Sequence, residues 1–462
     1  MRYLILSIVI LALSFSATAQ TVTQKLQKGF SVFEKDTQLT HAISSLYVID
    51  AQTGQVVFDK NSKIGLAPAS TQKIITSVTA FELLGKDYRY KTSFGIGKKN
   101  TEAFYIIPSG DPTLGSPRWN STKDDGLIKR IVNAIPKTST DFSSINLDNQ
   151  NWGADNIPDG WIWQDIANYY GASAVKLNFL ENQFDVVLKS GNKIGDPVEI
   201  VKTIPDLHYY ELKSQLTSAG KGTGDNAYIY FPLVGEFGII NGTIPINENG
   251  FKISGAFPHS EDQFIKTLKN EMSLKGINTG LAFESSKFSE MPKIEPNEYK
   301  IIYTETSPSL DSIIYWFNKK SINLYGEALI KTFAYEKQGF GSTDSGVSIV
   351  KKFWKEKKLD ENELNIVDGS GLSPLNRVTT HAQVEILKYA KTKDWFPYFY
   401  TSLPEYNGMK IKSGTIRNVK GFCGYHTAKN GKEYIFSFLV NNYNGSASGL
   451  VNKMYKVLDL LK

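Results

Sequence analysis

The amino-acid sequence predicts a protein of the α+β class with two or three domains, for three reasons. Its 462 residues exceed what a single hydrophobic core usually holds. Apolar residues recur at helical spacing just after Pro68 and again beyond residue 300. Between these parts, residues 91–300 contain short β-like runs separated by Gly, Pro, Asn and Asp. We therefore expect helix-containing parts at both ends of the chain and a β-rich part in the middle.

The first 19 residues have the features of a secretory signal peptide. Arg2 supplies a positive charge, residues 4–15 form a short apolar stretch, and residues 17–19 read Ala-Thr-Ala, which is typical of a cleavage site. No cysteine follows the apolar stretch, and no later segment is long and apolar enough to cross a membrane. We therefore expect an exported, periplasmic protein with no lipid or transmembrane anchor after removal of residues 1–19.

The elements near the N-terminal end are a hairpin and a helix. Residues 46–49 and 55–58 are β-rich runs on either side of a turn, which predicts a hairpin. A helix is predicted after Pro68 and ends at Gly85. Its apolar stripe is a core face and consists of Ile74, Ile75, Val78, Phe81 and Leu84.

The elements beyond residue 300 are mostly helical. Helices are predicted at residues 309–319, 323–335, 345–357 and 381–391. Residues 421–427 and 433–440 predict a second hairpin, because Asn430-Gly431 between two strand-like runs is a strong turn signal. A closing amphipathic helix is predicted from the spacing of Leu450, Met454, Val457 and Leu461.

Composition excludes several classes of function. The formal net charge of +6 is small for this length and no dense Lys/Arg run occurs, so nucleic-acid binding is not expected. Cys423 is the only cysteine, which rules out an intrachain disulfide, and its strand-like neighbours indicate a buried, inert thiol. The sequence contains neither H-E-x-x-H nor G-x-S-x-G, so a zinc peptidase or an α/β-hydrolase is poorly supported.

The stretch "PASTQKIITS", residues 68–77, has two interpretations. Ser70 could cap the helix, since Ser commonly opens helices. Lys73 is unusual in that case, because the first turn of a helix favours acidic residues. Alternatively, Ser70 is a nucleophile and Lys73 is its base, because an S-x-x-K motif places both side chains on one helix face. A lysine serves as a base only if burial or a second cation lowers its pKa.

Order along the chain separates this motif from chance matches. S-x-x-K also begins at Ser173, Ser190, Ser218 and Ser348. Only one series has S-x-x-K at a helix start, then S-x-N between two helices, then K-S-G-T on an edge-like strand. That series is Ser70/Lys73, then residues 321–323, then residues 412–415. Together these motifs are the signature of penicillin-binding proteins and serine β-lactamases.

At this point the sequence resembles the peptidase family S13, the low-molecular-mass class C penicillin-binding proteins of the D-alanyl-D-alanine carboxypeptidase/endopeptidase type. The resemblance covers nearly the whole mature chain. Beyond the three motifs, it includes "SGDPTL" (109–114), "GWIWQDIANYYGA" (160–172), "SINLYGEALIK" (321–331), "DGSGLSPLNRVT" (368–379) and "IKSGTIRNVKGFCGY" (411–425). The long separation between Ser70 and Ser321 also fits this family, whereas simple β-lactamases have a short one.

The resemblance implies an acyl-enzyme mechanism. Ser70 attacks the carbonyl carbon of a D-Ala-D-Xaa bond, and Lys73 takes its proton. Ser321 relays a proton toward the leaving amine, and Asn323 positions Lys73 and the substrate amide. Lys412 supplies positive potential, which helps to keep Lys73 neutral and to bind the terminal carboxylate.

The resemblance also implies contacts to the substrate. The hydroxyls of Ser413 and Thr415, on either side of Gly414, help to hold the terminal carboxylate. The backbone N–H groups of Ser70 and Thr415 form the oxyanion hole. No metal ion and no organic cofactor are implied.

The sequence departs from the family pattern at three positions. Ser413 stands for the usual Thr, and Ile322 stands where Asp is common. Pro374 stands where the family often has Arg, so the group that holds the substrate's diamino-acid carboxylate is open, with Arg377 as one candidate. Asp165 resembles a family position that faces the substrate side chain, and its alternative interpretation is a solvated loop acid.

The expected architecture is a discontinuous transpeptidase/β-lactamase-like domain, an antiparallel sheet flanked by helices, formed by residues 20–90 and 301–462. Residues 91–300 are expected to form a β-rich insertion of one or two small domains. The expected function is a secreted serine DD-peptidase that acts on peptidoglycan stem peptides or crosslinks and is acylated by β-lactam antibiotics. The alternatives are a β-lactamase or esterase on the same fold, and a non-catalytic peptidoglycan-binding protein.

Overall fold

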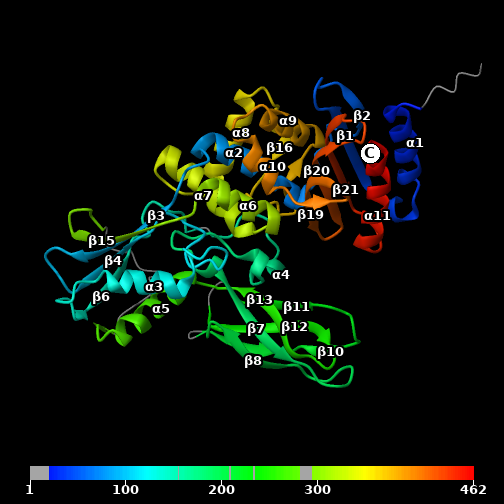
Figure 1. Cartoon of the computed structure of the whole chain (residues 1–462). Helices are drawn as coiled ribbons and strands as arrows, with labels where there is room; N and C mark the ends of the chain where they lie inside the picture. The colour runs from blue at the N-terminus through cyan, green and yellow to red at the C-terminus, as the bar shows by residue number, and fades with distance from the viewer. Residues whose placement is uncertain (1–19, 155, 208–209, 233–234, 281–293) are drawn as a thin grey trace, which may run out of the picture.

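The computed structural model describes residues 20–154, 156–207, 210–232, 235–280 and 294–462, and its architecture is α+β (Figure 1). The largest sheet is antiparallel and has the strand order β18-β19-β20-β21-β1-β2. Its strands are Glu405–Tyr406 (β18), Met409–Ile416 (β19), Val419–Thr427 (β20), Glu433–Asn441 (β21), Ile43–Asp50 (β1) and Val56–Lys60 (β2). Strands from the two ends of the sequence therefore lie side by side in one sheet.

Helices cover one face of this sheet, and α2 lies among them (Figure 1). They are Lys73–Leu84 (α2), Leu310–Lys320 (α6), Asn323–Gln338 (α7), Thr343–Glu356 (α8), Thr380–Lys391 (α9) and Phe396–Ser402 (α10). Ile74, Ile75 and Val78 of α2 belong to one core with apolar residues of these helices and of the sheet. Because α2 is surrounded by helices and sheet, most of its polar residues are also buried, Lys73 among them.

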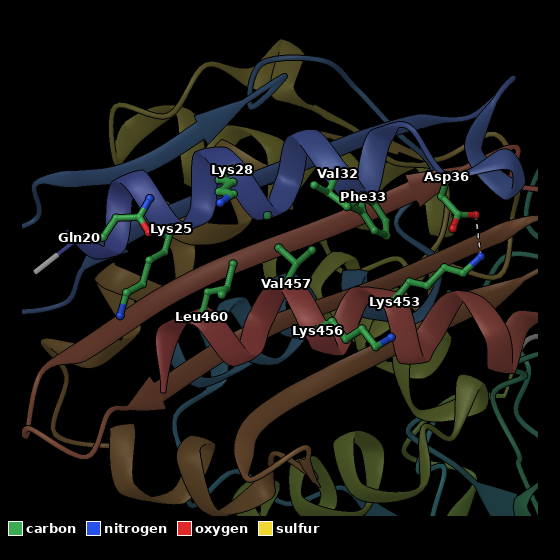
Figure 2. A pocket seen from close by; sticks show the side chains of 11 residues that line it. Gln20, Lys25, Lys28, Val32, Phe33, Asp36, Lys453, Lys456, Val457 and Leu460 are labelled. Carbon is green, nitrogen blue, oxygen red and sulfur yellow. Dashed lines mark hydrogen bonds and ion pairs between the residues drawn. The ribbon is translucent and has the colours of Figure 1, made fainter.

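Helices α1 (Val22–Glu34) and α11 (Ala447–Leu458) cover the other face of the sheet (Figure 1). Between them lies a groove of about 480 Å³, and Lys453 donates a hydrogen bond to Asp36 at one end (Figure 2). Val32 and Leu460 line the groove, whereas Ser70 does not. This groove is therefore separate from the S-x-x-K motif.

The chain between α2 and α6 forms two further parts. The first has a sheet of order β15-β3-β4-β6, covered by two helices that share its core. Its elements are Lys91–Gly97 (β3), Ala103–Ile107 (β4), Asp124–Asn133 (α3), Asp141–Phe142 (β5), Ser144–Leu147 (β6), Ser260–Leu274 (α5), Asn278–Thr279 (β14) and Tyr299–Thr306 (β15). The expected boundary at residue 300 falls inside β15, so this part extends to Thr306.

The second part is made of strands, and the short helix Trp163–Ile166 (α4) precedes them in the chain. One sheet has the order β13-β7-β8, and the other has β10-β12-β11, with β9 also paired to β12. The strands are Gln183–Lys189 (β7), Glu199–Ile204 (β8), Glu211–Ser214 (β9), Thr217–Ala219 (β10), Asn226–Tyr230 (β11), Phe237–Pro245 (β12) and Asn249–Ala256 (β13). Val186, Ile229 and Ile240 belong to one apolar core, so the two sheets pack as a single body.

The structure confirms both predicted hairpins, β1–β2 and β20–β21, and the predicted helices α2, α6, α7, α8, α9 and α11. Cys423 is buried in β20, as expected. Helices α1, α3, α4, α5 and α10 were not predicted. Because α3, α4 and α5 lie between residues 91 and 300, the middle of the chain is less purely β than expected. The predicted signal segment 1–19 lies outside the described residues. Within the described ranges, no helix has both the length and the hydropathy needed to cross a bilayer.

Candidate active site

Ser70 lies on a single turn of 3-10 helix, Ala69–Gln72, that leads directly into α2. Its side chain does not cap α2, because Gln72 occupies the N-cap position and no side chain bonds the helix backbone there. Instead, Ser70 Oγ lies 3.0 Å from Lys73 Nζ, within hydrogen-bonding distance. Ser70 is partly exposed, whereas Lys73 is fully buried. The structure thus joins the two residues as the S-x-x-K spacing predicts.

Close backbone contacts hold the turn that carries Ser70. Ala69 has a φ of 46°, a left-handed conformation that costs about 1 kcal/mol or more for a residue with a side chain. Its carbonyl lies against Gly371, where a Cβ would come within 2.0 Å of Ala69 O. On the other side, a Cβ at Gly414 of β19 would lie 2.6 Å from Pro68 O and 2.9 Å from Ser70 N. Only residues without side chains let these segments approach the turn so closely.

The amine of Lys73 has three neighbours and no contact with solvent. Its Nζ donates to Asn323 Oδ1 at 2.6 Å and to the carbonyl of Ser370 at 2.7 Å, in addition to the contact with Ser70. Burial lowers the pKa of Lys73 well below its usual value, and the charge of Lys412 lowers it further. A neutral amine that donates both protons to Asn323 and Ser370 presents its lone pair to Ser70, as a general base must.

The S-x-N motif lies at the junction of α6 and α7. Ser321 ends α6 in a left-handed conformation, φ 56°, and α7 begins two residues later at Asn323. Ser321 Oγ accepts a hydrogen bond from Lys412 Nζ at 3.0 Å, while Asn323 Oδ1 accepts one from Lys73. The sharp turn therefore lets one short motif contact both lysines.

The K-S-G-T motif lies on β19, where one edge of the strand is open. β20 pairs with residues 412–415 on one side, and no described strand pairs with them on the other, because β18 reaches only Met409 and Lys410. Lys412 is buried, and its Nζ also donates to the carbonyl of Ser413 at 2.9 Å. Burial lowers the pKa of Lys412 to about 7. Thr415 is exposed at this open edge, where an extended peptide can add as a further strand.

Asp165 is connected to the cluster through Tyr170. Asn323 Nδ2 donates to the carbonyl of Tyr170 at 2.7 Å, and the Tyr170 side chain is a hydrogen-bond partner of Asp165. Burial raises the pKa of Asp165, and the bond with Tyr170 opposes this rise. Asp165 is half-buried on α4, so it is not a freely solvated loop acid.

Arg377 is not brought into this cluster. It lies on the short strand Arg377–Val378 (β17), which pairs with Leu364–Asn365 (β16). Its guanidinium donates to the carbonyls of Pro374 and Asn376 in its own loop. The structure therefore gives no contact between Arg377 and the residues around Ser70.

Sequence reasoning assigned no role to the acidic residues beneath the site. Asp368 is fully buried and accepts hydrogen bonds from Gln72, between the two motif residues, and from Trp161. Glu327 of α7 is also buried and accepts one from the backbone N–H of Gly369. Both acids lie in segments that carried the family resemblance, but a buried position cannot be recognised from one sequence alone.

The other S-x-x-K matches lie in different surroundings. Ser190 donates its hydroxyl proton to the carbonyl of Pro245, and Lys176 pairs with Asp148 at 3.1 Å. Ser348 is exposed on α8. None of these matches contacts the S-x-N or K-S-G-T motif within the described part of the chain.

The arrangement has the parts needed for nucleophilic acyl transfer. It contains a partly exposed hydroxyl, a buried amine in contact with it, and a second hydroxyl bonded to a second buried amine. Backbone N–H groups at a strand edge beside the nucleophile provide donors for an oxyanion. Such a site can form and hydrolyse an ester on Ser70.

Comparison with known proteins assigns a family. The model of the D-Ala-D-Ala carboxypeptidase 3 (S13) family matches residues 26–459. The D-alanyl-D-alanine carboxypeptidase of Actinomadura sp. (strain R39) is 23% identical over 92% of this chain and 82% of its own length. The D-alanyl-D-alanine carboxypeptidase DacB of Haemophilus influenzae is 22% identical over 92% of this chain and 88% of its own.

Solved structures show the same fold. The crystal structure of penicillin binding protein 4 (dacB) from Haemophilus influenzae covers 93% of this chain and 98% of its own, with a TM-score of 0.76 and 17% identity. A second crystal structure of that protein, complexed with a β-lactam, covers 96% of this chain and 99% of its own, with a TM-score of 0.72 and 17% identity. The likeness extends over both the helix-flanked sheet and the middle parts.

Proposed function

We propose, since the chain belongs to the D-Ala-D-Ala carboxypeptidase 3 (S13) family and is a serine-type carboxypeptidase, that it cleaves peptidoglycan stem peptides through an acyl-enzyme on Ser70. The observation that carries this proposal is the 3.0 Å contact between the hydroxyl of the partly exposed Ser70 and the fully buried amine of Lys73. Burial and a nearby cation both favour the neutral form of an amine, and a neutral amine can act as a base.

The acylation step follows from the contacts of Ser70. The neutral amine of Lys73 takes the hydroxyl proton as Ser70 Oγ attacks the carbonyl carbon that precedes the terminal residue. The resulting oxyanion accepts hydrogen bonds from the N–H of Ser70, on the turn before α2, and from the N–H of Thr415, on the open strand β19. Positive charge on Lys412 attracts the terminal carboxylate of the substrate, with the hydroxyls of Ser413 and Thr415 beside it.

Breakdown of the tetrahedral intermediate requires a proton on the leaving amine. Ser321 donates its hydroxyl proton to that nitrogen and regains one from Lys412, to which it is hydrogen-bonded. The C–N bond breaks, the terminal amino acid departs, and the acyl group stays on Ser70 as an ester. Before deacylation, the proton that Lys73 took from Ser70 passes through solvent to Lys412, which restores both lysines. A water molecule then attacks the ester carbonyl as Lys73 takes a proton from that water, and the C–O bond to Ser70 breaks as Lys73 returns the proton to Ser70 Oγ.

The proposal extends to substrates, inhibitors and location. The open edge of β19 suits an extended stem peptide, and the leaving group can be D-Ala or the diamino acid of a crosslink. Tyr170 lies beside Asn323 and Asp165 is the partner of the Tyr170 side chain, so we propose that this pair contacts the substrate side chain. The β-lactam complex of the Haemophilus influenzae protein supports β-lactams as covalent inhibitors. The signal-like segment 1–19 supports export to the periplasm.

The domain organisation proposed from the sequence also fits this function. Residues 20–90 and 301–462, the two segments of the proposed catalytic domain, carry Ser70, Ser321 and Lys412, and the part between them carries Asp165 and Tyr170. We propose that the middle part shapes substrate selection while the discontinuous domain performs the chemistry.

Intact-mass spectrometry after brief exposure to benzylpenicillin tests the proposal. We expect a one-to-one adduct on the wild type, no adduct on Ser70→Ala, and acylation slowed by about 10² to 10⁴ on Lys73→Met, as loss of a general base predicts. Ser348→Ala and Lys351→Met, from a second S-x-x-K match, are matched controls that should acylate normally. Release of D-Ala from a stem pentapeptide, measured with the same variants, tests the natural reaction.

The remaining outcomes discriminate between the alternatives. Consumption of penicillin without an accumulating adduct would show β-lactamase turnover. No adduct and no consumption, together with no release of D-Ala, would refute catalysis at Ser70 and favour a non-catalytic peptidoglycan-binding protein.

A further inference from the structure

Glu327 is a buried acid beside the site to which the mechanism above gives no role. It lies on the second turn of α7, one turn after Asn323, and only 1% of its surface is exposed. Its Oε2 accepts a hydrogen bond from the backbone N–H of Gly369 at 3.0 Å. Its Oε1 has no hydrogen-bond partner among the described residues. An ionised Glu327 would leave this oxygen without solvation, so the neutral acid is the favoured form.

Asp368 is the charged member of this pair of acids. Its Oδ1 accepts hydrogen bonds from Gln72, Gly371 and Asn376, and its Oδ2 accepts from Trp161 and Ser373. Five donors around two oxygens satisfy a carboxylate and leave no place for a proton. Burial and the nearby charge of Asp368 raise the pKa of Glu327 to about 8, whereas hydrogen bonds from the Gly369 N–H and the Ser370 side chain, and the charge of Lys73, oppose the rise.

The Gly369–Ser370 segment links Glu327 to Lys73. Glu327 fixes the N–H of Gly369, the carbonyl of Gly369 accepts a hydrogen bond from Thr76 Oγ1 at 2.7 Å, and the carbonyl of Ser370 accepts one from Lys73 at 2.7 Å. Gly369 and Gly326 are packed so closely that a Cβ on Gly369 would lie 2.2 Å from Gly326 O. The Ser370 carbonyl, which orients the amine of Lys73, is therefore held in place by its contacts with α7.

We propose that Glu327, as an uncharged acid, is a positioning residue for acylation: it fixes the Gly369–Ser370 segment and thereby directs the amine of Lys73 toward Ser70. Its neutrality matters as much as its hydrogen bond. A second carboxylate charge beside Lys73 would raise the pKa of the amine and hold the base in its protonated, inactive form. This proposal rests on the proposed function of Ser70 and Lys73.

The pH dependence of acylation distinguishes a neutral from an ionised Glu327. The rate of adduct formation with benzylpenicillin is measured from pH 5 to 9 for the wild type and for Glu327→Gln, which copies the uncharged acid. We expect the acid limb, where Lys73 becomes protonated, at the same pH in both proteins, with a loss in rate of no more than about threefold. A downward shift of that limb by one pH unit or more in Glu327→Gln would mean that a negative charge had been removed, and would overturn the proposal.

Glu327→Ala tests the positioning role, with Glu336→Gln as a control from an exposed position of the same helix. We expect Glu327→Ala to lower the maximal acylation rate by about tenfold or more, without a matching change in the penicillin concentration that half-saturates it. Equal rates for a folded Glu327→Ala and the wild type would refute the proposal. If Glu327→Ala does not fold, the comparison with Glu327→Gln still decides it. Absence of acylation in the wild type would instead count against Ser70 chemistry, so the two failures are distinct.

Discussion

At the scale of single residues, the site depends on two buried lysines with different surroundings. Lys73 contacts Ser70, Asn323 and Ser370, and burial together with the charge of Lys412 keeps its pKa low. Lys412 contacts Ser321 and sits at the strand edge, where an incoming carboxylate can restore the solvation that burial removed. One lysine therefore suits proton removal, and the other suits the recognition of an anion.

The pKa of Lys412 predicts how substrate binding changes with pH. Burial lowers this pKa to about 7, so the ammonium is present below pH 7 and is lost as the pH rises above it. We expect the concentration of benzylpenicillin that half-saturates acylation to increase above pH 7, by at most about tenfold per pH unit. Acylation rates over a range of penicillin concentrations at each pH measure this.

The methyl ester of the same penicillin is the control for this prediction. It lacks the carboxylate, so its half-saturating concentration should not follow the titration of Lys412. Equal pH dependence of acid and ester would contradict the assignment of Lys412 as the carboxylate-binding group.

At the scale of elements, the site forms where α2, β19 and the α6–α7 junction meet. At Gly414, β19 approaches the backbone of the Ser70 turn without a side chain between them. The left-handed conformation of Ser321 brings the hydroxyl and Asn323 to the same place from the helical side. Each motif in the sequence thus marks the end or the edge of an element, where side chains from different elements can meet.

Gly414→Ala is expected to separate β19 from the nucleophile. A Cβ there would lie 2.6 Å from Pro68 O and 2.8 Å from Thr71 N, so strand or turn must shift. We expect acylation by benzylpenicillin to slow by about a hundredfold, since small displacements at a reacting centre have effects of this size. Overpacking should also lower the free energy of unfolding by about 1 to 3 kcal/mol.

Gly220→Ala is the control for the same substitution at an uncrowded position, where the nearest atom to an added Cβ is 3.9 Å away on Thr223. It should leave acylation and the urea midpoint unchanged. Normal acylation in Gly414→Ala would show that the close approach of β19 is not needed for the reaction.

At the scale of the whole molecule, the middle part is fixed to the helices that carry the S-x-N motif. Glu181 accepts hydrogen bonds from Ser116 and Arg118 of the middle part and from the hydroxyl of Tyr325 on α7. Trp119 donates to Ser312 of α6. Since Tyr325 lies two residues after Asn323, this contact ties the middle part to the site itself.

Tyr325→Phe removes one hydrogen bond from this buried contact. We expect the free energy of unfolding to fall by about 1 to 2 kcal/mol, because a charged, buried acceptor loses one of its donors. Urea denaturation measures the loss. Tyr105→Phe is the control, because the hydroxyl of Tyr105 has no hydrogen-bond partner among the described residues. It should change the free energy of unfolding by less than about 0.5 kcal/mol. Equal stability of both variants would mean that the Glu181 contact does not hold the parts together.

The sequence by itself determined the elements and the motifs that lie on them. The hairpins were predictable because strand-like runs flank a turn, and the helices because apolar residues recur at helical spacing, both of which are local properties. The order of the three motifs identified Ser70, Lys73, Ser321, Asn323 and Lys412 together, and the structure brings these five residues into contact. Helices such as α3 and α5 were missed, although their apolar residues pack on the sheet of the middle part.

Only the tertiary structure decided the protonation states and the supporting contacts. Whether Lys73 is a base depends on burial and on Lys412, which is 339 positions away in the sequence and therefore invisible to any local pattern. Local sequence also could not show that the Arg377 guanidinium bonds to its own loop. Nor could it distinguish Glu327 from an exposed acid on a helix, because its burial depends on the fold. Desolvation and charge act through space, so the chemistry of this site is a property of the folded chain.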